Sequence, residues 1–210
     1  GTLAGSGSVD LESGASRWRL AVRALDLAAL HRALVPTSLA GTLDADVRET
    51  VQTLRGDVRQ RDLRLAFDAR YDGREIVASR LVAEARGGEA TGSGRIAFDA
   101  ARTFAVTAQA RRFDPSRFGA FPAGKLDGDV AVRGTLAPLA LDADVTASAG
   151  SRLAGLPLSG RVRGRFARDA VAGLAADIAY GGTKLRAEGD YGRHGDRLAL
   201  HVDARRLDEV

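Results

Sequence analysis

The 210-residue chain contains no cysteine, no methionine and no asparagine, and Lys125 and Lys184 are its only lysines. Without cysteine, the chain forms neither a disulfide framework nor a thiolate metal site. Its longest stretch without a charged residue covers positions 33–43, whereas a membrane-spanning helix needs about twenty apolar residues. These absences exclude a disulfide scaffold, a cysteine metal centre and a transmembrane helix within the sequence.

Aromatic residues make up 5% of the chain and charged residues 28%. The 31 basic residues nearly balance the 27 acidic ones and alternate with them, which is typical of a mixed, solvated surface. Arg161, Arg163 and Arg165 form the one concentrated basic stripe, and no aromatic residue lies between them as nucleic-acid binding would favour. We expect them to pair with aspartates of a neighbouring strand, with lipid headgroups or an acidic protein as alternatives. No nucleic-acid partner is predicted.

The sequence repeats itself with a period near 90 residues. Positions 104–114 return at 198–208, positions 25–30 match 113–118, and the glycine-rich stretch 5–11 returns at 92–98. Such repetition indicates a stacked architecture in which each unit contacts its neighbours. We therefore expect one continuous segment of a longer protein, with units at about 1–86, 87–180 and a truncated 181–210.

Apolar residues recur at every second position, as in half-buried antiparallel strands. In 158–166, for example, leucine, glycine, valine and phenylalanine occupy one phase and serine and arginine the other. Several glycines, among them Gly128 and Gly160, lie in the apolar phase. They indicate a strongly bent sheet, room for something that is not protein, or both. Gly5 and Gly92 begin stretches that we expect to precede strands.

These patterns predict an all-β fold: a long curved antiparallel sheet forming a taco-like trough with an apolar concave face, plus one or two short helices. One helix is expected after Asp26 and another after Asp114. In the second, Pro115 occupies the first helical position. A face rich in alanine and glycine fills a protein interior poorly and is a candidate binding groove. The predicted groove lining consists of Leu20, Val22, Leu63, Leu65, Phe67, Phe104, Val106, Leu126, Gly128, Val130, Val132, Gly134, Leu158, Gly160, Val162, Gly164, Phe166, Leu185, Leu198, Leu200 and Val202.

Catalytic and metal-binding patterns are missing from the sequence. The histidines, His31, His194 and His201, lack the spacing of metal ligands. No G-x-S-x-G motif or nucleotide-binding fingerprint occurs. Aspartates two positions apart, such as 127 and 129 or 142 and 144, lie in the polar phase among arginines, as on any solvated strand. We predict a protein that is not an enzyme and has no cofactor or bound metal.

Three local patterns resemble the TamB family of AsmA-like bridge proteins. They are the strand 126–136 with the sequence LDGDVAVRGTL, the link 153–160 with the sequence LAGLPLSG, and the junction FDPSRF at 113–118 with its relative at 25–30. The resemblance spans essentially the whole chain, which would be a middle section of such a protein. It implies the periplasmic portion of an inner-membrane-anchored protein of a Gram-negative bacterium.

The resemblance also implies a function. Members of the family carry phospholipid toward the outer membrane, contribute to assembly of outer-membrane proteins and pair with an Omp85-type barrel through other parts of the protein. The expected partners are phospholipid acyl chains, and outer-membrane protein clients are possible ones. The alternative is a scaffold or chaperone that binds such clients by β-augmentation at an edge of the trough. A passive solenoid with a filled core remains a third interpretation.

Overall fold

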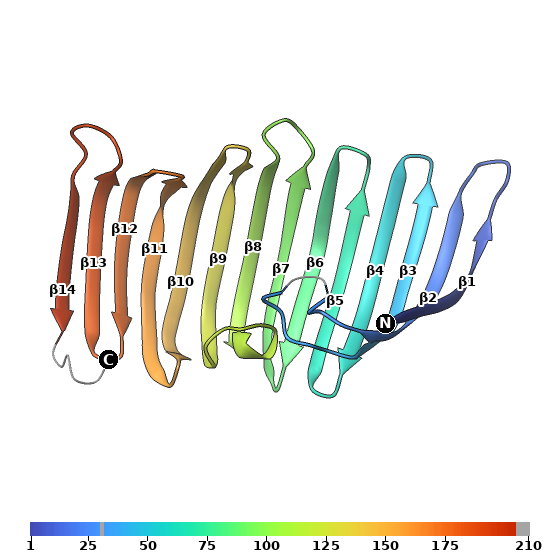
Figure 1. The fold of residues 1–210 in the computed structure, drawn as a ribbon, viewed down its shortest axis with the longest axis horizontal. Helices are drawn as coiled ribbons and strands as arrows, with labels where there is room; N and C mark the ends of the chain where they lie inside the picture. Colours follow the sequence, from blue (N-terminus) through green and yellow to red (C-terminus); the bar gives the residue numbers. More distant parts are fainter. Residues whose placement is uncertain (30–31, 205–210) are drawn as a thin grey trace.

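The computed structural model describes residues 1–29 and 32–204, and this part of the chain forms one antiparallel sheet of fourteen strands (Figure 1). The strands pair in sequence order, so the sheet is a continuous meander with β1 and β14 at its two ends. The strands are β1 (Thr2–Val9), β2 (Ser16–Leu25), β3 (Leu39–Arg48), β4 (Val51–Gln60), β5 (Leu63–Tyr71), β6 (Glu75–Ala85), β7 (Gly88–Ala97), β8 (Thr103–Phe113), β9 (Gly124–Leu136), β10 (Leu139–Leu153), β11 (Leu156–Ala167), β12 (Ala170–Tyr180), β13 (Thr183–Tyr191) and β14 (Leu198–Ala204). The predicted fold class is confirmed.

The expected repeat units hold β1 to β6, β7 to β12, and β13 with β14. The glycine-rich stretches that begin at Gly5 and Gly92 do not precede strands, and that expectation is wrong. They lie inside β1 and β7, which occupy the first position of the first two units. Glycine alternates there with serine or threonine, so the period of two is kept although the residues have little intrinsic strand propensity.

Glycines on the apolar side of the strands bring neighbouring backbones unusually close. A Cβ atom added to Gly128 would lie 2.0 Å from the carbonyl oxygen of Thr146, and one added to Gly41 would lie 2.0 Å from that of Asp57. In a regular sheet, a Cβ points away from the adjacent strand. A residue with a Cβ atom would clash with the neighbouring backbone at these positions. Glycine at such positions introduces curvature into a sheet.

Two longer connections interrupt the series of tight turns. Connector A (residues 26–38) joins β2 to β3, and connector B (residues 114–123) joins β8 to β9, six strands further along. Each follows a residue with positive φ at the end of a strand, Ala24 or Arg112. The register shifts at both places, so each connector follows an irregularity that redirects the strand end.

An aspartate holds each connector closed at its base. Asp114 Oδ1 accepts hydrogen bonds from the backbone N–H of Ser116 (3.2 Å) and of Gly124 (3.0 Å), at the two ends of connector B. Asp26 Oδ1 likewise accepts from the N–H of Ala28 (3.0 Å) and of Thr37 (2.9 Å). The repeated sequences 25–30 and 113–118 thus begin two connectors that are closed in the same way, by an aspartate.

Only one of the two expected helices is present in the described residues. The 3₁₀ helix Pro115–Arg117 follows its cap Asp114, as the sequence predicts. Connector A has turns in its described part, while Leu30 and His31 lie outside the described residues. Its base is closed by Thr37, whose Oγ1 accepts from Leu27 N–H (2.9 Å) and donates to the Leu25 carbonyl (3.0 Å). The base of connector A is therefore held by side-chain-to-backbone hydrogen bonds of Thr37 and Asp26.

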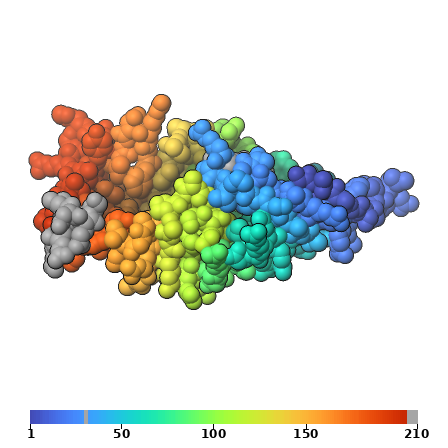
Figure 2. Space-filling view, turned by 60° about the horizontal axis from the view of Figure 1, so that its bottom comes forward, coloured from blue at the N-terminus to red at the C-terminus, as the bar shows by residue number. Residues whose placement is uncertain are grey.

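The two connectors meet, although six strands separate the points where they leave the sheet. Leu34 and Gly119 form a β-bridge, Val35 N–H donates to the Phe118 carbonyl (3.1 Å), and Ala120 N–H donates to the Ala33 carbonyl (2.9 Å). Figure 2 shows connector A in blue against connector B in yellow-green. We call this contact the clasp. It ties the end of β2 to the end of β8 along one long edge of the sheet.

The sheet therefore has two different long edges. The connector edge carries both connectors and the turns at 61–62, 86–87, 154–155 and 181–182. The turn edge carries the connections at 10–15, 49–50, 72–74, 98–102, 137–138, 168–169 and 192–197. A small core lies at the connector edge, where Leu27 of connector A packs against Val22, Leu39 and Val58 of the sheet.

Candidate functional site

One face of the sheet is apolar along its whole length. Strand pairing aligns Val106 with Val132, and Val130 with Val145, which in turn pairs with Val162. Leu20 pairs with Leu43 near one end of the sheet, and Leu185 with Val202 near the other. Because side chains alternate between faces, this register places every residue of the predicted groove lining on the same face, which we call the apolar face.

The apolar face is substantially open to solvent. Trp18 is 41% exposed, Leu81 40% and Val106 39%, although all three lie on strands flanked on both sides. Further exposed side chains on this face are Leu3, Leu54, Ile76, Leu136, Leu139, Val145, Tyr191, Leu198, Leu200 and Val202. A contiguous apolar surface of this extent is unusual in a protein that works alone in water.

Burial on the apolar face changes from one long edge to the other. Near the connector edge Leu39 is 0% exposed and Val58 2%, because connector A packs over them. Along the same strand β4, Leu54 lies toward the turn edge and is 38% exposed. Beside connector A, the connector-edge part of the face is filled by the protein's own side chains and the turn-edge part is not. At the two ends of the sheet the face is exposed toward the connector edge as well, with Leu3 at 62% and Val202 at 54%.

Sequence reasoning omitted several residues of this face. Leu54, Ile76 and Leu81 belong to β4 and β6, strands that contributed nothing to the predicted lining. The signal was present in β4, where Leu54, Gly56 and Val58 alternate with Arg55, Asp57 and Arg59. In β6 a register irregularity between Ala78 and Leu81 shifts the alternation by one residue and hides it.

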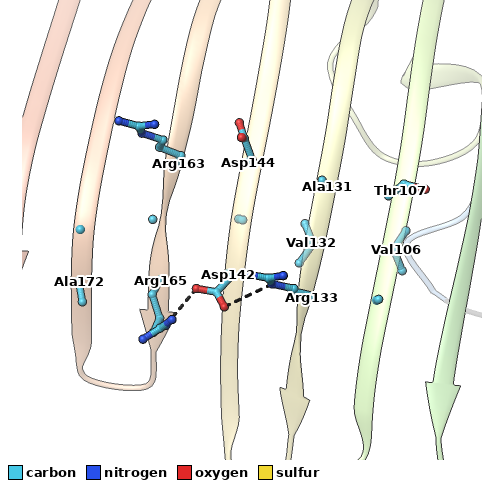
Figure 3. Close-up of a pocket in the computed structure, with 14 residues that line it drawn as sticks. Val106, Thr107, Ala131, Val132, Arg133, Asp142, Asp144, Arg163, Arg165 and Ala172 are labelled. Carbon is cyan, nitrogen blue, oxygen red and sulfur yellow. Dashed lines mark hydrogen bonds and ion pairs between the residues drawn. The ribbon is translucent and has the colours of Figure 1, made fainter.

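The opposite face is polar and carries a ladder of ion pairs across the strands. Asp142 of β10 lies between Arg165 of β11 (Nε to Oδ1, 3.0 Å) and Arg133 of β9 (Nε to Oδ2, 3.7 Å), as Figure 3 shows. Asp144 binds Arg161, whose guanidinium donates to both carboxylate oxygens and lowers the pKa of Asp144 below its usual value. Two arginines of the predicted basic stripe therefore pair with neighbouring aspartates as expected. Arg163 makes no salt bridge with the described residues.

Several hollows lie on the polar face of the sheet. One hollow of about 670 Å³ spans β8 to β12. Ala105, Ala131 and Ala172 lie on it, with Arg133, Arg165 and Asp142 among them (Figure 3). Since these charges largely neutralise one another and are exposed, the hollow is typical of the space between long surface side chains. The apolar face, and not this hollow, is the candidate site.

The described residues contain no cluster of histidine, aspartate and glutamate side chains that could hold a metal ion. His194 lies in the turn before β14 and His201 on its polar side, while His31 lies outside the described residues. In the same part of the chain, no helix combines the length and the apolar character needed to cross a membrane.

No protein-family model matches the chain, and no curated protein or solved structure is similar to it. The function is accordingly inferred from the geometry of the two faces and two edges, together with the resemblance carried by the sequence motifs.

Proposed function

We propose that this chain is a non-enzymatic segment of a bridge that carries phospholipid, with acyl chains on the apolar face and headgroups outside it. The observation that carries this proposal is the continuity of the exposed apolar face from β1 to β14. Thirteen strand spacings of about 4.8 Å correspond to a path of roughly 60 Å. This path is several times as long as a site that holds one small ligand.

The chemistry of the face suits transport better than capture. Removing an acyl chain from water stabilises it by about 0.8 kcal/mol per methylene. Valine, leucine, alanine and glycine side chains on this face offer no hydrogen bonds that would fix one position or one lipid. A chain can move from strand to strand without crossing water, because the same types of side chain recur on each strand.

The wider role follows from the resemblance to the TamB family. We propose that the segment works in the periplasm of a Gram-negative bacterium, in a protein anchored in the inner membrane, and moves phospholipid toward the outer membrane. An Omp85-type barrel would bind other parts of that protein. The same structure would support assembly of outer-membrane proteins.

Lipid extraction by the purified protein tests the proposal. The protein is incubated with vesicles of phosphatidylethanolamine and phosphatidylglycerol, separated from them, and analysed for bound lipid by native mass spectrometry. We expect phospholipid bound to the protein, with more than one molecule per chain because the face is long. A protein that emerges free of lipid at every protein-to-lipid ratio would contradict the proposal.

A second candidate function is that of a scaffold that binds outer-membrane protein clients by β-augmentation. In this function the backbone of a strand edge, and not the apolar face, would bind the client. Under this scaffold function, charges on the apolar face would leave client binding intact. Under the lipid-carrying function they would block transport.

A further inference from the structure

The two long edges of the sheet offer a lipid different access to the apolar face. At the connector edge, the clasp and Leu27 lie over Val22, Leu39 and Val58, so the protein itself occupies the space that an acyl chain would need. At the turn edge, Trp18, Leu54 and Ile76 lie near the ends of their strands and remain exposed. Where the connectors cover the face, a lipid therefore reaches its open part over the turn edge.

Arginines recur in the turns of this open edge. Arg74 lies between β5 and β6, Arg102 between β7 and β8, and Arg168 between β11 and β12. Arg193 and Arg197 lie between β13 and β14. All are exposed, and their guanidinium groups form no salt bridge or side-chain hydrogen bond with the described residues. Turns that are two strands apart place such groups about 10 Å from each other.

The turns of this edge also contain carboxylates, and those in the turns of Arg74 and Arg102 are engaged with the chain of the turn. Asp72 accepts hydrogen bonds from the backbone N–H of Arg74 (3.0 Å) and of Glu75 (3.1 Å). Asp99 accepts from the hydroxyl and the backbone N–H of Thr103, and these bonds hold the pKa of Asp99 below its usual value. The aspartates shape the turns, and the guanidinium donors of Arg74 and Arg102 stay available.

We propose that phospholipids enter over the turn edge and that its arginines bind the headgroup phosphate while the acyl chains lie on the open part of the apolar face. This inference rests on the proposed function. A guanidinium binds phosphate through two parallel hydrogen bonds. Exposed apolar side chains beside unpaired arginines match the two parts of a phospholipid: hydrocarbon tails and an anionic phosphate.

Two acyl-labelled probes separate headgroup binding from tail binding: fluorescent phosphatidylethanolamine, and fluorescent diacylglycerol, which lacks the phosphate. The test variant carries Arg102→Gln and Arg168→Gln at the turn edge. The matched control carries Arg61→Gln and Arg112→Gln at the connector edge, where both arginines are also exposed and also form no salt bridge with the described residues. Arg102 of the test variant and both residues of the control, Arg61 and Arg112, have a positive φ near 50°, so the control disturbs the backbone at least as much as the test variant.

We expect the turn-edge variant to bind phosphatidylethanolamine roughly five- to tenfold more weakly, the loss expected for removing charge-assisted hydrogen bonds at an exposed site. Its binding of diacylglycerol and both affinities of the control should equal those of the unmodified protein. Unchanged phosphatidylethanolamine binding, equal loss of both lipids, or an equal loss in the control would overturn the inference while leaving the proposed function intact. Failure of the unmodified protein to bind either lipid would overturn both.

Discussion

Val106→Glu is expected to abolish phospholipid transfer while leaving the sheet folded. Val106 is 39% exposed on the apolar face, so a carboxylate there keeps contact with water and costs little stability in the lipid-free protein. An acyl chain passing over it would take the charge into hydrocarbon, at a cost on the order of 3 kcal/mol. Transfer of a fluorescent phospholipid between vesicles should fall by roughly a hundredfold, since about 1.4 kcal/mol corresponds to a factor of ten.

The matched control for this substitution is the next residue. Thr107 is also exposed, but it points to the polar face, where its hydroxyl lies 3.1 Å from that of Ser93. Thr107→Glu introduces the same charge on the same strand and should transfer phospholipid at the rate of the unmodified protein. Equal rates in the two variants would mean that the apolar face does not carry the lipid, and would favour the scaffold function.

Gly128→Ala is expected to have the largest effect on stability. Its new methyl group would lie 2.0 Å from the Thr146 carbonyl oxygen, so β9 and β10 must separate or shift. No flexible side chain can move aside, because the atoms in the way belong to the backbone. We expect a loss of about 3 kcal/mol, the upper part of the range for overpacking, measured as a lower urea midpoint.

Gly164→Ala is the control for that prediction. Gly164 lies on the same face two strands away, and its nearest neighbours would be 3.3 Å (Leu174 Cα) and 3.4 Å (Phe166 ring) from an added Cβ. We expect a change of less than about 1 kcal/mol, because alanine also loses less conformational entropy on folding than glycine. If both variants lose the same stability, the close backbone approach at Gly128 is not what requires glycine there.

The faces of the strands could be predicted because a period of two determines them directly. The alternation of Leu158, Gly160 and Val162 with Ser159, Arg161 and Arg163 is enough to assign each side chain of β11 to a face. The cap at Asp114 could be predicted from the proline that follows it. In β1 and β7, glycine and serine carry little strand propensity, so those strands became evident only through pairing.

The difference between the two long edges was not predictable. The bridge between Leu34 and Gly119 joins positions far apart in the chain, and neither residue type indicates a partner. The second hydrogen bond of each closing aspartate, to Thr37 or Gly124, likewise depends on where the chain returns to the sheet. Local patterns describe the strands, but where the apolar face is covered is decided by these long-range contacts.

Paired photocrosslinking in cells tests the central claim most directly. A photoreactive amino acid replaces Val130, which pairs with Val145 on the apolar face, or its neighbour Asp129, which lies on the polar face near Gln109. In cells with labelled phospholipid, we predict lipid adducts at position 130 and none at position 129. Protein adducts alone, or equal lipid labelling at both positions, would contradict transport along the apolar face.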